Sequence, residues 1–396
     1  MISLSRSVQE LEESQTLAFT QLARRKREQG IDVISLTAGE PDFPTPEHVK
    51  QAAVQAIASN FTHYTANEGM PDLLQAICAK FAADNNLRYS PDQILVSSGA
   101  KQSLFNALRA LLNRGDEVII LAPYWVSYPA IVRLADGIPV IVPSRIENGF
   151  RPDIQGIKSA ISPRTRALIL NSPCNPSGVV FEPGEIEELA AIVREAGLVA
   201  VSDEIYEKVM FDGRTHLSIG TVADIRDQVV TVNGVSKAYA MTGWRIGYMG
   251  GPREIIHAAA KVQGQITNNA NSIAQVAAVA ALIGPQDPIR KMTAEFERRR
   301  DFVCNRLSAL PRARFRKPGG GMYVFINVEE YFGKGNGHHV ADARQLALSL
   351  LEHHHVALVP GDAFGDPASL RLSFACALDV LAEGMDRLER GLQELG

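Results

Sequence analysis

One glycine-rich run of the chain carries a lysine, an arginine and a serine that together could hold an aldehyde bearing a phosphate group. The run reads Gly234-Val235-Ser236-Lys237-Ala238-Tyr239-Ala240-Met241-Thr242-Gly243-Trp244-Arg245-Ile246-Gly247. The amine of Lys237 can form an imine with an aldehyde, and burial beside other cations lowers the pKa of such a lysine. The guanidinium of Arg245 offers a rigid fork of donors suited to a phosphate, and the Ser236 hydroxyl adds a further polar group. An isolated lysine in a loop would be an ordinary surface residue, but the complete run favours a chemical role.

A carboxylate and a phenol lie upstream of that run. The segment Ser202-Asp203-Glu204-Ile205-Tyr206-Glu207 directly follows the apolar stretch Leu198–Val201. Taken alone, Asp203 and Glu204 could cap a helix and begin its exposed first turn. Because the segment follows a predicted strand and precedes the lysine run, we favour a functional role for Asp203 and Tyr206.

Three further segments could contact a ligand, although each also has an ordinary structural explanation. The small-residue turn Ser97–Gln102 leads into a helix, whose free N–H groups and positive dipole end suit an anion. The segment Asn171–Gly178 contains prolines and a glycine and would form a turn in any protein. In Ser369–Phe374, alternation places Arg371 on the face opposite three apolar residues. There it could grip a carboxylate through two parallel hydrogen bonds, or it could be exposed to solvent.

The elements that must position these residues show a regular pattern between about Gln93 and Gly250. Five short apolar segments alternate with helix-period segments: Ile94–Val96, Val118–Leu121, Ala167–Leu170, Leu198–Val201 and Val229–Val232. Nearly continuous hydrophobicity is typical of strands covered on both faces, which predicts a mainly parallel sheet between helices. A helix after the first strand is predicted from the apolar stripe at Leu104, Leu108, Leu111 and Leu112. Ligands in such folds bind at the carboxyl ends of the strands, where Asp203 and Lys237 fall.

The two ends of the chain predict a second, smaller domain. Residues 1–44 form an N-terminal arm with one helix, closed by the turn Gly39–Pro44. A long charged helix from Lys291 to Leu310 precedes Gly319–Gly321, and short strands and helices follow. We therefore predict a large domain over residues 45–285 and a smaller α+β domain built from residues 1–44 and 286–396. The arm and the glycine run are the parts expected to move.

Composition excludes several other classes of protein. Apolar residues make up 46% of the chain and charged residues 21%, and a net charge of -4 with mixed signs argues against a nucleic-acid partner. No segment has the roughly 18 consecutive apolar residues of a membrane helix, and the first residues do not form a signal peptide. The four cysteines are far apart and form no CxxC pair, which predicts free thiols in a cytoplasmic protein. We expect no metal site, because the consecutive residues His353–His355 cannot converge on one ion and are expected to form an exposed loop.

The run around Lys237 resembles the lysine signature of class I aminotransferases, and every constrained position of that pattern is met. The resemblance extends over essentially the whole chain, to the bacterial aspartate aminotransferases of the subgroup that also includes prephenate aminotransferases. It implies fold type I, with a mainly parallel seven-stranded sheet, and pyridoxal 5′-phosphate held as a Schiff base on Lys237. Lys237 would then be the base that moves the substrate Cα proton in a ping-pong scheme. The resemblance implies that Asp203 faces the pyridine nitrogen and that Tyr206 bonds to O3′ of the cofactor.

The same resemblance assigns the remaining contacts to the cofactor. The group placed around its phosphate comprises Gly99, Ala100, Lys101, Ser236 and Arg245. Trp125 resembles the aromatic residue stacked on the pyridine ring and beside the substrate. Asn175 resembles the asparagine that donates to O3′ and also contacts the substrate.

Substrate binding and assembly are implied in the same way. Arg371 is implied to bind the α-carboxylate of the amino acid, and the backbone of Gly39 to close over it. Tyr64 resembles a residue that reaches the cofactor phosphate of a neighbouring subunit, which implies a homodimer with shared active sites. The partners expected are therefore an amino acid, a 2-oxo acid and a second copy of the chain.

Substrate choice is left open by the residues themselves. A dicarboxylate needs a second cation for its distal carboxylate, and Lys101 is one candidate. Some relatives carry a lysine near position 12 that is associated with prephenate, whereas this chain has Glu12-Glu13-Ser14-Gln15 there. Aspartate with 2-oxoglutarate is therefore the favoured pair. The alternative substrates are prephenate and aromatic or small neutral amino acids, and the alternative reaction is that of a lyase of the same fold. A regulator that merely binds the cofactor is disfavoured, because it would need a DNA-binding segment for which the chain has no room.

Overall fold

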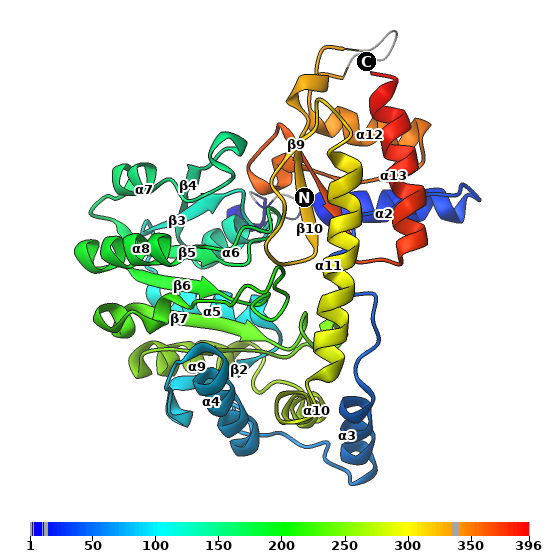
Figure 1. The fold of residues 1–396 in the computed structure, drawn as a ribbon. Coiled ribbons are helices and arrows are strands. Elements are labelled where there is room, and N and C mark those ends of the chain that lie inside the picture. Colours follow the sequence, from blue (N-terminus) through cyan, green and yellow to red (C-terminus); the bar gives the residue numbers. More distant parts are fainter. Residues whose placement is uncertain (1, 3, 10, 12–14, 335–339, 396) are drawn as a thin grey trace.

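A seven-stranded sheet forms the centre of the larger part of the protein in this computed structural model, which describes residues 2, 4–9, 11, 15–334 and 340–395 (Figure 1). Its strands, in spatial order, are β2 (Ile94–Ser97), β8 (Gly247–Gly250), β7 (Val229–Gly234), β6 (Val199–Asp203), β5 (Thr165–Asn171), β3 (Glu117–Ala122) and β4 (Ile138–Pro143). All neighbours pair in parallel except β8, which is antiparallel to both β2 and β7. The predicted fold class is confirmed, as are the five strands expected from the apolar segments.

Strands β4 and β8 had no comparable signal in the sequence. Strand β4 lies at the sheet edge, carries two prolines and is only partly buried. Strand β8 reads Gly-Tyr-Met-Gly, with a glycine at each end. In β4 the β-branched run Val140–Val142 lies between two prolines, which are typical of an edge strand, and β8 contains no β-branched residue.

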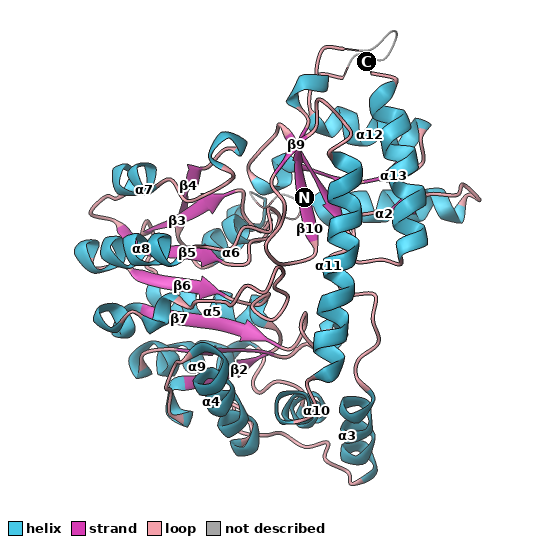
Figure 2. Cartoon of the chain, in the orientation of Figure 1, coloured by secondary structure: helices cyan, strands magenta, loops and turns pink. Residues whose placement is uncertain are grey.

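Helices cover both faces of this sheet (Figure 2). Along β3, Val118 and Ile120 pack against one layer, formed by α5 (Ala100–Leu111), α6 (Tyr128–Leu134) and α9 (Arg253–Ile266). The intervening Ile119 packs against the other layer, which contains α7 (Ile154–Ala160) and α8 (Pro183–Ala196). Successive side chains of a strand point to opposite faces, so a strand buried on both sides must be apolar throughout.

The edge of the sheet near β2 is covered by a third group of helices. These are α3 (Glu47–Ala58), α4 (Pro71–Asn85) and α10 (Ser272–Ile283). Their apolar residues form one buried cluster with Ile94 and Val96 of β2 and Tyr248 of β8.

The smaller part of the protein contains a four-stranded antiparallel sheet and draws on both ends of the chain. The sheet has the order β12 (Val359–Pro360), β13 (Ser369–Ser373), β10 (Tyr323–Asn327) and β9 (Arg314–Phe315). Close to the N-terminus, β1 (Ile34–Ser35) pairs in parallel with β11 (Val356–Ala357). The helices that pack in this part are α2 (Gln15–Glu28), α12 (Ala343–His353) and α13 (Leu378–Gln393), and the short helix α1 (Arg6–Gln9) precedes α2 in the chain. The pairing of β1 with β11 supports a smaller unit built from both ends, while the exact domain boundaries stay a prediction.

A long helix, α11 (Asp287–Leu307), connects the two parts and is the long yellow helix of Figure 1. The sequence predicted this helix from Lys291 to Leu310, so the predicted bounds are wrong by four residues at the start and three at the end. The helix begins earlier because Pro288 occupies its first turn, where a proline needs no hydrogen-bonding partner. It ends at Leu307, after which Leu310 and Ala313 close short turns.

The expectation of an exposed histidine loop was wrong in part. His353 is exposed but ends α12, and His354 and His355 are half-buried ahead of β11. His354 lies 3.4 Å from a carboxylate oxygen of Glu394, so its side chain is engaged on the surface of the smaller part.

The four cysteines are free, as predicted. Burial raises the pKa of Cys304 to about 12 and that of Cys376 to about 11, which fits packing residues. Among the helices of the described residues, none is both long and apolar enough to cross a membrane.

Candidate active site

The carboxyl ends of β5 and β6 bring two of the expected site segments into direct contact. Strand β6 ends at Asp203, whose backbone oxygen accepts a hydrogen bond of 2.9 Å from the side chain of Asn171 at the end of β5. The side-chain oxygen of Asn171 accepts from the backbone N–H of Asn175, also at 2.9 Å. Asn171 therefore holds the Asn175 turn against the Asp203 strand, as expected for adjacent parallel strands.

Lys237 lies just beyond the end of β7 and faces two other predicted site residues. Its Nζ atom donates to the backbone oxygen of Gly39 at 2.5 Å and lies 5.8 Å from the centre of the Tyr206 ring. The residue as a whole is partly exposed, while burial of its amine lowers the pKa of Lys237, with Arg371 and Arg245 adding to that effect. A lowered pKa favours the neutral amine, which is the form of lysine that reacts with an aldehyde.

Asp203 is buried and is held by a tyrosine that the sequence analysis did not assign. The hydroxyl of Tyr128 donates to Oδ2 of Asp203 at 2.8 Å, and the N–H of Ile205 donates to Oδ1 at 3.3 Å. Burial raises the pKa of Asp203 to about 6, against the lowering effect of the two hydrogen bonds. The ring of Tyr128 also contacts Trp125 edge-on, with centroids 5.4 Å apart. The close spacing of Trp125 and Tyr128 was the available signal, since the two residues begin and end one turn, closed by the Tyr128 N–H donating to the Trp125 oxygen at 2.9 Å.

The predicted phosphate site lies where α5 begins. Gly99 has φ +91°, and a Cβ atom there would lie 2.3 Å from Nη2 of Arg245, so this position requires glycine. The N–H of Gly99 itself donates to the Ser97 oxygen at 2.7 Å, which leaves the N–H groups of Ala100 and Lys101 in the first helical turn as the donors for an anion.

Arg245 and Lys101 surround this helix end with positive charge. Arg245 is exposed and donates to the backbone oxygen of Thr242 at 3.0 Å. Lys101 has its Nζ atom 4.9 Å from the centre of the Trp125 ring, and burial followed by the nearby Arg245 lowers the pKa of Lys101. Neither cation forms an ion pair with a carboxylate in the part of the chain that the structure describes, so both are available to an anionic ligand.

Arg371 is inside the protein, and the alternative of an exposed strand arginine is therefore wrong. Its side chain is 2% exposed, donating to the Asn175 side-chain oxygen at 3.2 Å and to the Thr37 backbone oxygen at 2.9 Å. The guanidinium lies 4.3 Å from the centre of the Tyr323 ring and 4.9 Å from that of Phe364. Its Nε atom is buried without a hydrogen-bonding partner. A buried, unpaired guanidinium is unfavourable unless an anion binds it, which supports a carboxylate site.

The remaining predicted residues differ in how far they are exposed to solvent. Ser236 is buried next to Lys237, and Trp125 is half-buried. Tyr64 is 85% exposed. A tyrosine that projects into solvent could reach a second copy of the chain, but its proposed role there stays a prediction.

Tyr323 is a second tyrosine of the site that sequence reasoning missed. Its hydroxyl lies 3.1 Å from that of Tyr206, and its ring lies against the Arg371 guanidinium. It follows the glycine run Gly319–Gly321, which packs against Gly178, Val209 and Phe211 through backbone hydrogen bonds. The two tyrosines are 117 residues apart in the chain, so no local sequence pattern could predict their contact.

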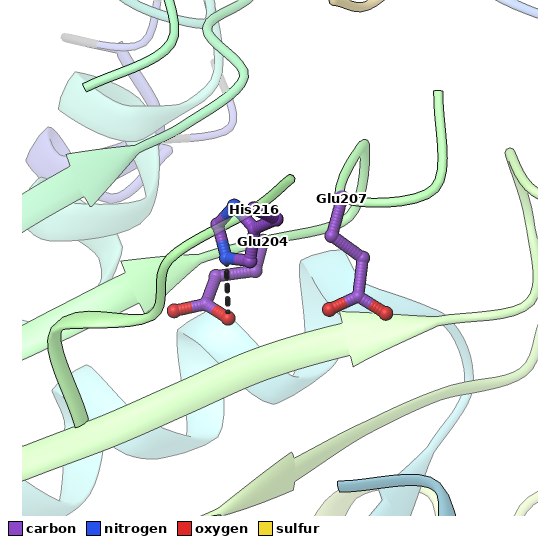
Figure 3. Close-up of side chains that lie close together, drawn as sticks. All are labelled: Glu204, Glu207 and His216. Atoms are coloured by element: carbon purple, nitrogen blue, oxygen red, sulfur yellow. Dashed lines mark ion pairs between the residues drawn. The ribbon is translucent and has the colours of Figure 1, made fainter. Parts of the chain in front are cut away.

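A cluster of charged side chains lies beside the site and supports the segment that carries Asp203 and Tyr206. Figure 3 shows Glu204, Glu207 and His216, whose ligand-type atoms lie within 4.8 Å of one another. The Nε2 atom of His216 is 2.9 Å from a carboxylate oxygen of Glu204. Glu204 also accepts from the hydroxyls of Ser202 at 2.9 Å and Ser218 at 2.6 Å.

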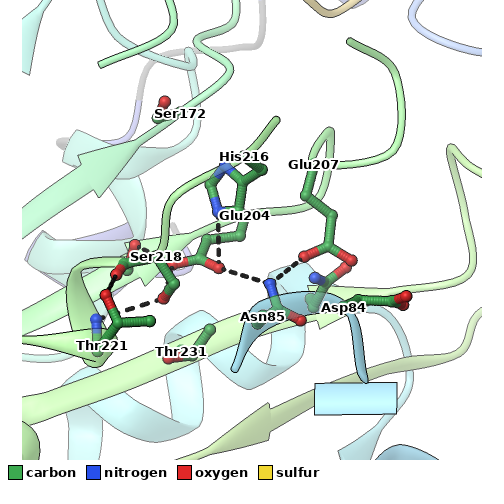
Figure 4. Close-up of polar contacts among 12 residues, drawn as sticks. Asp84, Asn85, Ser172, Glu204, Glu207, His216, Ser218, Thr221 and Thr231 are labelled. Atoms are coloured by element: carbon green, nitrogen blue, oxygen red, sulfur yellow. Dashed lines mark hydrogen bonds and ion pairs between the residues drawn. The ribbon is translucent and has the colours of Figure 1, made fainter. Parts of the chain in front are cut away.

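Glu207 completes this cluster with partners from α4. Figure 4 shows the Asn85 side chain between the two carboxylates, 2.5 Å from Glu207 and 3.4 Å from Glu204. The ammonium of Lys80 forms an ion pair with Glu207 and donates to Asn85 at 2.6 Å. Lys80 and His216 already face the carboxylates, so internal pairing accounts for the charges of this cluster.

The pKa values inside the cluster reflect this pairing. Burial alone would raise the pKa of Glu204, but the charge of His216 and hydrogen bonds from His216, Ser218 and Ser202 lower it overall. Burial alone would lower the pKa of His216, but Glu204 raises it overall. Each partner therefore stabilises the charged form of the other.

Comparison with known proteins identifies the class of this site. The chain belongs to the family of class I and II aminotransferases, whose family model matches residues 31–388.

Particular relatives agree over nearly the full length. The structure of an aspartate aminotransferase from Rhizobium meliloti superposes with a TM-score of 0.97 at 42% identity and covers 100% of both chains. An aspartate aminotransferase from Thermus thermophilus, solved with maleate, has a TM-score of 0.93 at 42% identity over 99% of this chain and 100% of that one. An aspartate/prephenate aminotransferase from Nitrosomonas europaea is 44% identical over 98% of this chain and 99% of its own length.

Proposed function

We propose that this protein is a pyridoxal 5′-phosphate-dependent aminotransferase that moves an amino group between aspartate and 2-oxoglutarate. The observation that carries the proposal is the position of Lys237, whose amine faces Gly39 and Tyr206 and has a pKa lowered mainly by burial. The family places an aldehyde-bearing cofactor on such a lysine, as the sequence analysis predicted.

The residues present fit the cofactor. An anion such as its phosphate suits the start of α5, where the glycine at position 99 leaves room for the Arg245 guanidinium and the N–H groups of Ala100 and Lys101 are available. Asp203 would face the pyridine nitrogen, held in place by Tyr128. When bound, the cofactor supplies an electron sink for the bond-breaking step at the substrate Cα.

The chain's own groups then have distinct tasks. The amine of Lys237, when not bound to the cofactor, would accept the proton of the substrate Cα and hold it for return to the product. The carboxylate of Asp203, with a pKa near 6 before any ligand is bound, is charged when a cation lies opposite it, and it keeps that cation protonated. The Tyr206 hydroxyl and the Asn175 side-chain amide would hold the cofactor through hydrogen bonds to its ring oxygen.

Arg371 would bind the α-carboxylate of the substrate. Asn175 and Thr37 fix its two terminal nitrogens, and the unpartnered Nε adds a further donor. Lys101 is the proposed cation for the distal carboxylate. The names of the relatives favour aspartate, and one of them adds prephenate. The segment Glu12–Ser14, which in the sequence argued against prephenate, lies outside the described residues.

We further infer a homodimer and a cytoplasmic location. The 85% exposed Tyr64 supports the first, since its predicted contact is with a partner subunit. Four free cysteines support the second.

The test is a spectroscopic titration of the purified protein with single amino acids. If aspartate or glutamate removes the absorbance band of the lysine-bound cofactor and 2-oxoglutarate or oxaloacetate restores it, dicarboxylate transamination is established. Response only to aromatic or small neutral amino acids would overturn the aspartate assignment. If the protein converts an amino acid to products when no 2-oxo acid is present, it is a lyase instead. Prephenate is tested in the same assay as an alternative acceptor of the amino group.

A further inference from the structure

Tyr323 contacts both Arg371, the proposed binding residue for the substrate, and Tyr206, a proposed binding residue for the cofactor. It lies on β10 of the smaller sheet and is 1% exposed. Its ring centre is 4.3 Å from the Arg371 guanidinium, the proposed carboxylate site, and its hydroxyl is 3.1 Å from that of Tyr206, which faces Lys237. One side chain thus joins the substrate side of the site to the cofactor side.

The ring of Tyr323 holds the guanidinium in a defined plane. Strands β10 and β13 pair with Tyr323 opposite Ser373 and Phe325 opposite Arg371, so Tyr323 and Arg371 are diagonal neighbours on adjacent strands. A cation over an aromatic face is stabilised most where water is excluded, as it is here. Loss of the ring would leave the guanidinium with the Phe364 ring and two hydrogen bonds, and its plane less well fixed.

The hydroxyl of Tyr323 acts on Tyr206. Either oxygen of the pair could be the donor. If Tyr206 donates its proton toward the cofactor oxygen, as the family resemblance implies, its own oxygen must accept the proton of Tyr323. The rings meet edge-on with centroids 6.1 Å apart, so the contact is fixed by packing as well as by the hydrogen bond.

We propose that Tyr323 is a positioning residue with two separable parts. Its ring orients Arg371 for the substrate carboxylate, and its hydroxyl orients the Tyr206 phenol toward the cofactor. The proposal rests on the function proposed above and deepens it.

Two substitutions separate the parts. Tyr323→Phe keeps the ring and removes the hydroxyl, whereas Tyr323→Leu removes both. The matched control is Tyr331→Phe, which alters a buried tyrosine of the same part of the molecule, 3% exposed and outside the site. The readouts are kcat and KM for aspartate, the Kd of maleate, and the pH midpoint of the cofactor absorbance in the loaded protein.

For Tyr323→Phe, we expect kcat to fall by about tenfold, as for one lost hydrogen bond, and the absorbance midpoint to shift. The Kd of maleate should stay within about twofold of the wild type, because the cation–π contact remains. For Tyr323→Leu, we expect the same fall in kcat together with a rise of about tenfold in the maleate Kd. Tyr331→Phe should match the wild type in every readout.

The inference is overturned if the wild type transaminates aspartate and Tyr323→Phe matches it in both kcat and absorbance midpoint. It is equally overturned if Tyr323→Leu binds maleate as tightly as Tyr323→Phe does. These results leave the proposed function intact. A wild-type protein with no lysine-bound cofactor would instead overturn the proposed function and the inference together. Since Tyr323→Phe removes only one oxygen, it keeps the test decisive even if Tyr323→Leu folds poorly.

Discussion

The site around Lys237 and the neighbouring cluster of Glu204, Glu207 and His216 use charge in opposite ways. In the site, the cations Lys101, Lys237, Arg245 and Arg371 form no ion pairs within the described ranges of the chain, and they meet backbone oxygens, an amide and aromatic rings instead. In the cluster, each carboxylate meets a cation or several donors.

The short segment from Asp203 to Glu207 contributes residues to both regions. Asp203 contacts Tyr128 and Tyr206 contacts Tyr323, both on the side of the site. Glu204 and Glu207 contact His216, Lys80 and Asn85 in the cluster. Paired acidic and histidine side chains therefore support the structure here, whereas the cations without ion pairs coincide with the predicted ligand site.

The largest expected effect comes from Lys237→Ala. Turnover should fall by at least about a thousandfold, because the proposed general base and the proposed attachment point of the cofactor are both lost. The absorbance band of the lysine-bound cofactor should disappear in the same protein. Lys261→Ala, at an exposed lysine of α9, serves as control and should leave both unchanged. A fully active Lys237→Ala protein would contradict the assignment of the site.

Arg371→Lys should produce the next largest effect. The positive charge is kept but the planar fork is lost, so kcat/KM for aspartate should fall by about 100-fold, as when hydrogen bonds to a charged group are removed. The cofactor absorbance should be retained. Steady-state kinetics together with the spectrum check this, and an unchanged kcat/KM would exclude Arg371 as the carboxylate site.

Glu204→Gln tests the other region. The amide keeps the shape but removes the charge that faces His216, so the free energy of unfolding should fall by about 2 kcal/mol. Denaturant unfolding of the cofactor-free protein measures this loss. The kcat of the folded, cofactor-loaded variant should stay within about threefold, since Glu204 contacts neither Lys237 nor Arg371. Loss of turnover with unchanged stability would show that the division into a reacting site and a supporting cluster is wrong.

A smaller effect is expected in the pH dependence of stability. The pKa of His216 is raised above its ordinary value of 6.5 by Glu204. Its contribution to stability is therefore fully present below pH 6.5 and is lost as the pH rises through the raised pKa. The stability advantage of the wild type over His216→Gln should accordingly shrink above pH 6.5, as measured by urea unfolding across pH 5 to 9. An advantage that grows with pH would contradict the ion pair.

The smallest effect should come from divalent metal ions. Zn²⁺ or Mn²⁺ added to the protein should change the melting temperature by less than about 1 °C, because Lys80 and His216 already neutralise the cluster. A clear stabilisation that Glu204→Gln abolishes would make the cluster a metal site after all.

The family and the central strands were predictable from local sequence, while the residues assigned to the cofactor stay predictions. Each central strand is a short, nearly continuous apolar run, and Asp203 and Lys237 follow such runs directly. The edge strand β4 and the glycine-flanked β8 were not predicted, because prolines interrupt the apolar pattern of β4 and glycines that of β8.

The sequence by itself determined the class of chemistry, because a lysine, a small-residue turn before a helix and a carboxylate all follow buried strands, whose carboxyl ends meet at one edge of a parallel sheet. Tertiary structure alone decided which groups surround them. The contact of Tyr323 with Tyr206 spans 117 residues, and Arg371 is buried although its strand pattern allowed exposure. Contacts between segments so far apart depend on how the two sheets pack, and that packing is a property of the whole chain that no local pattern encodes.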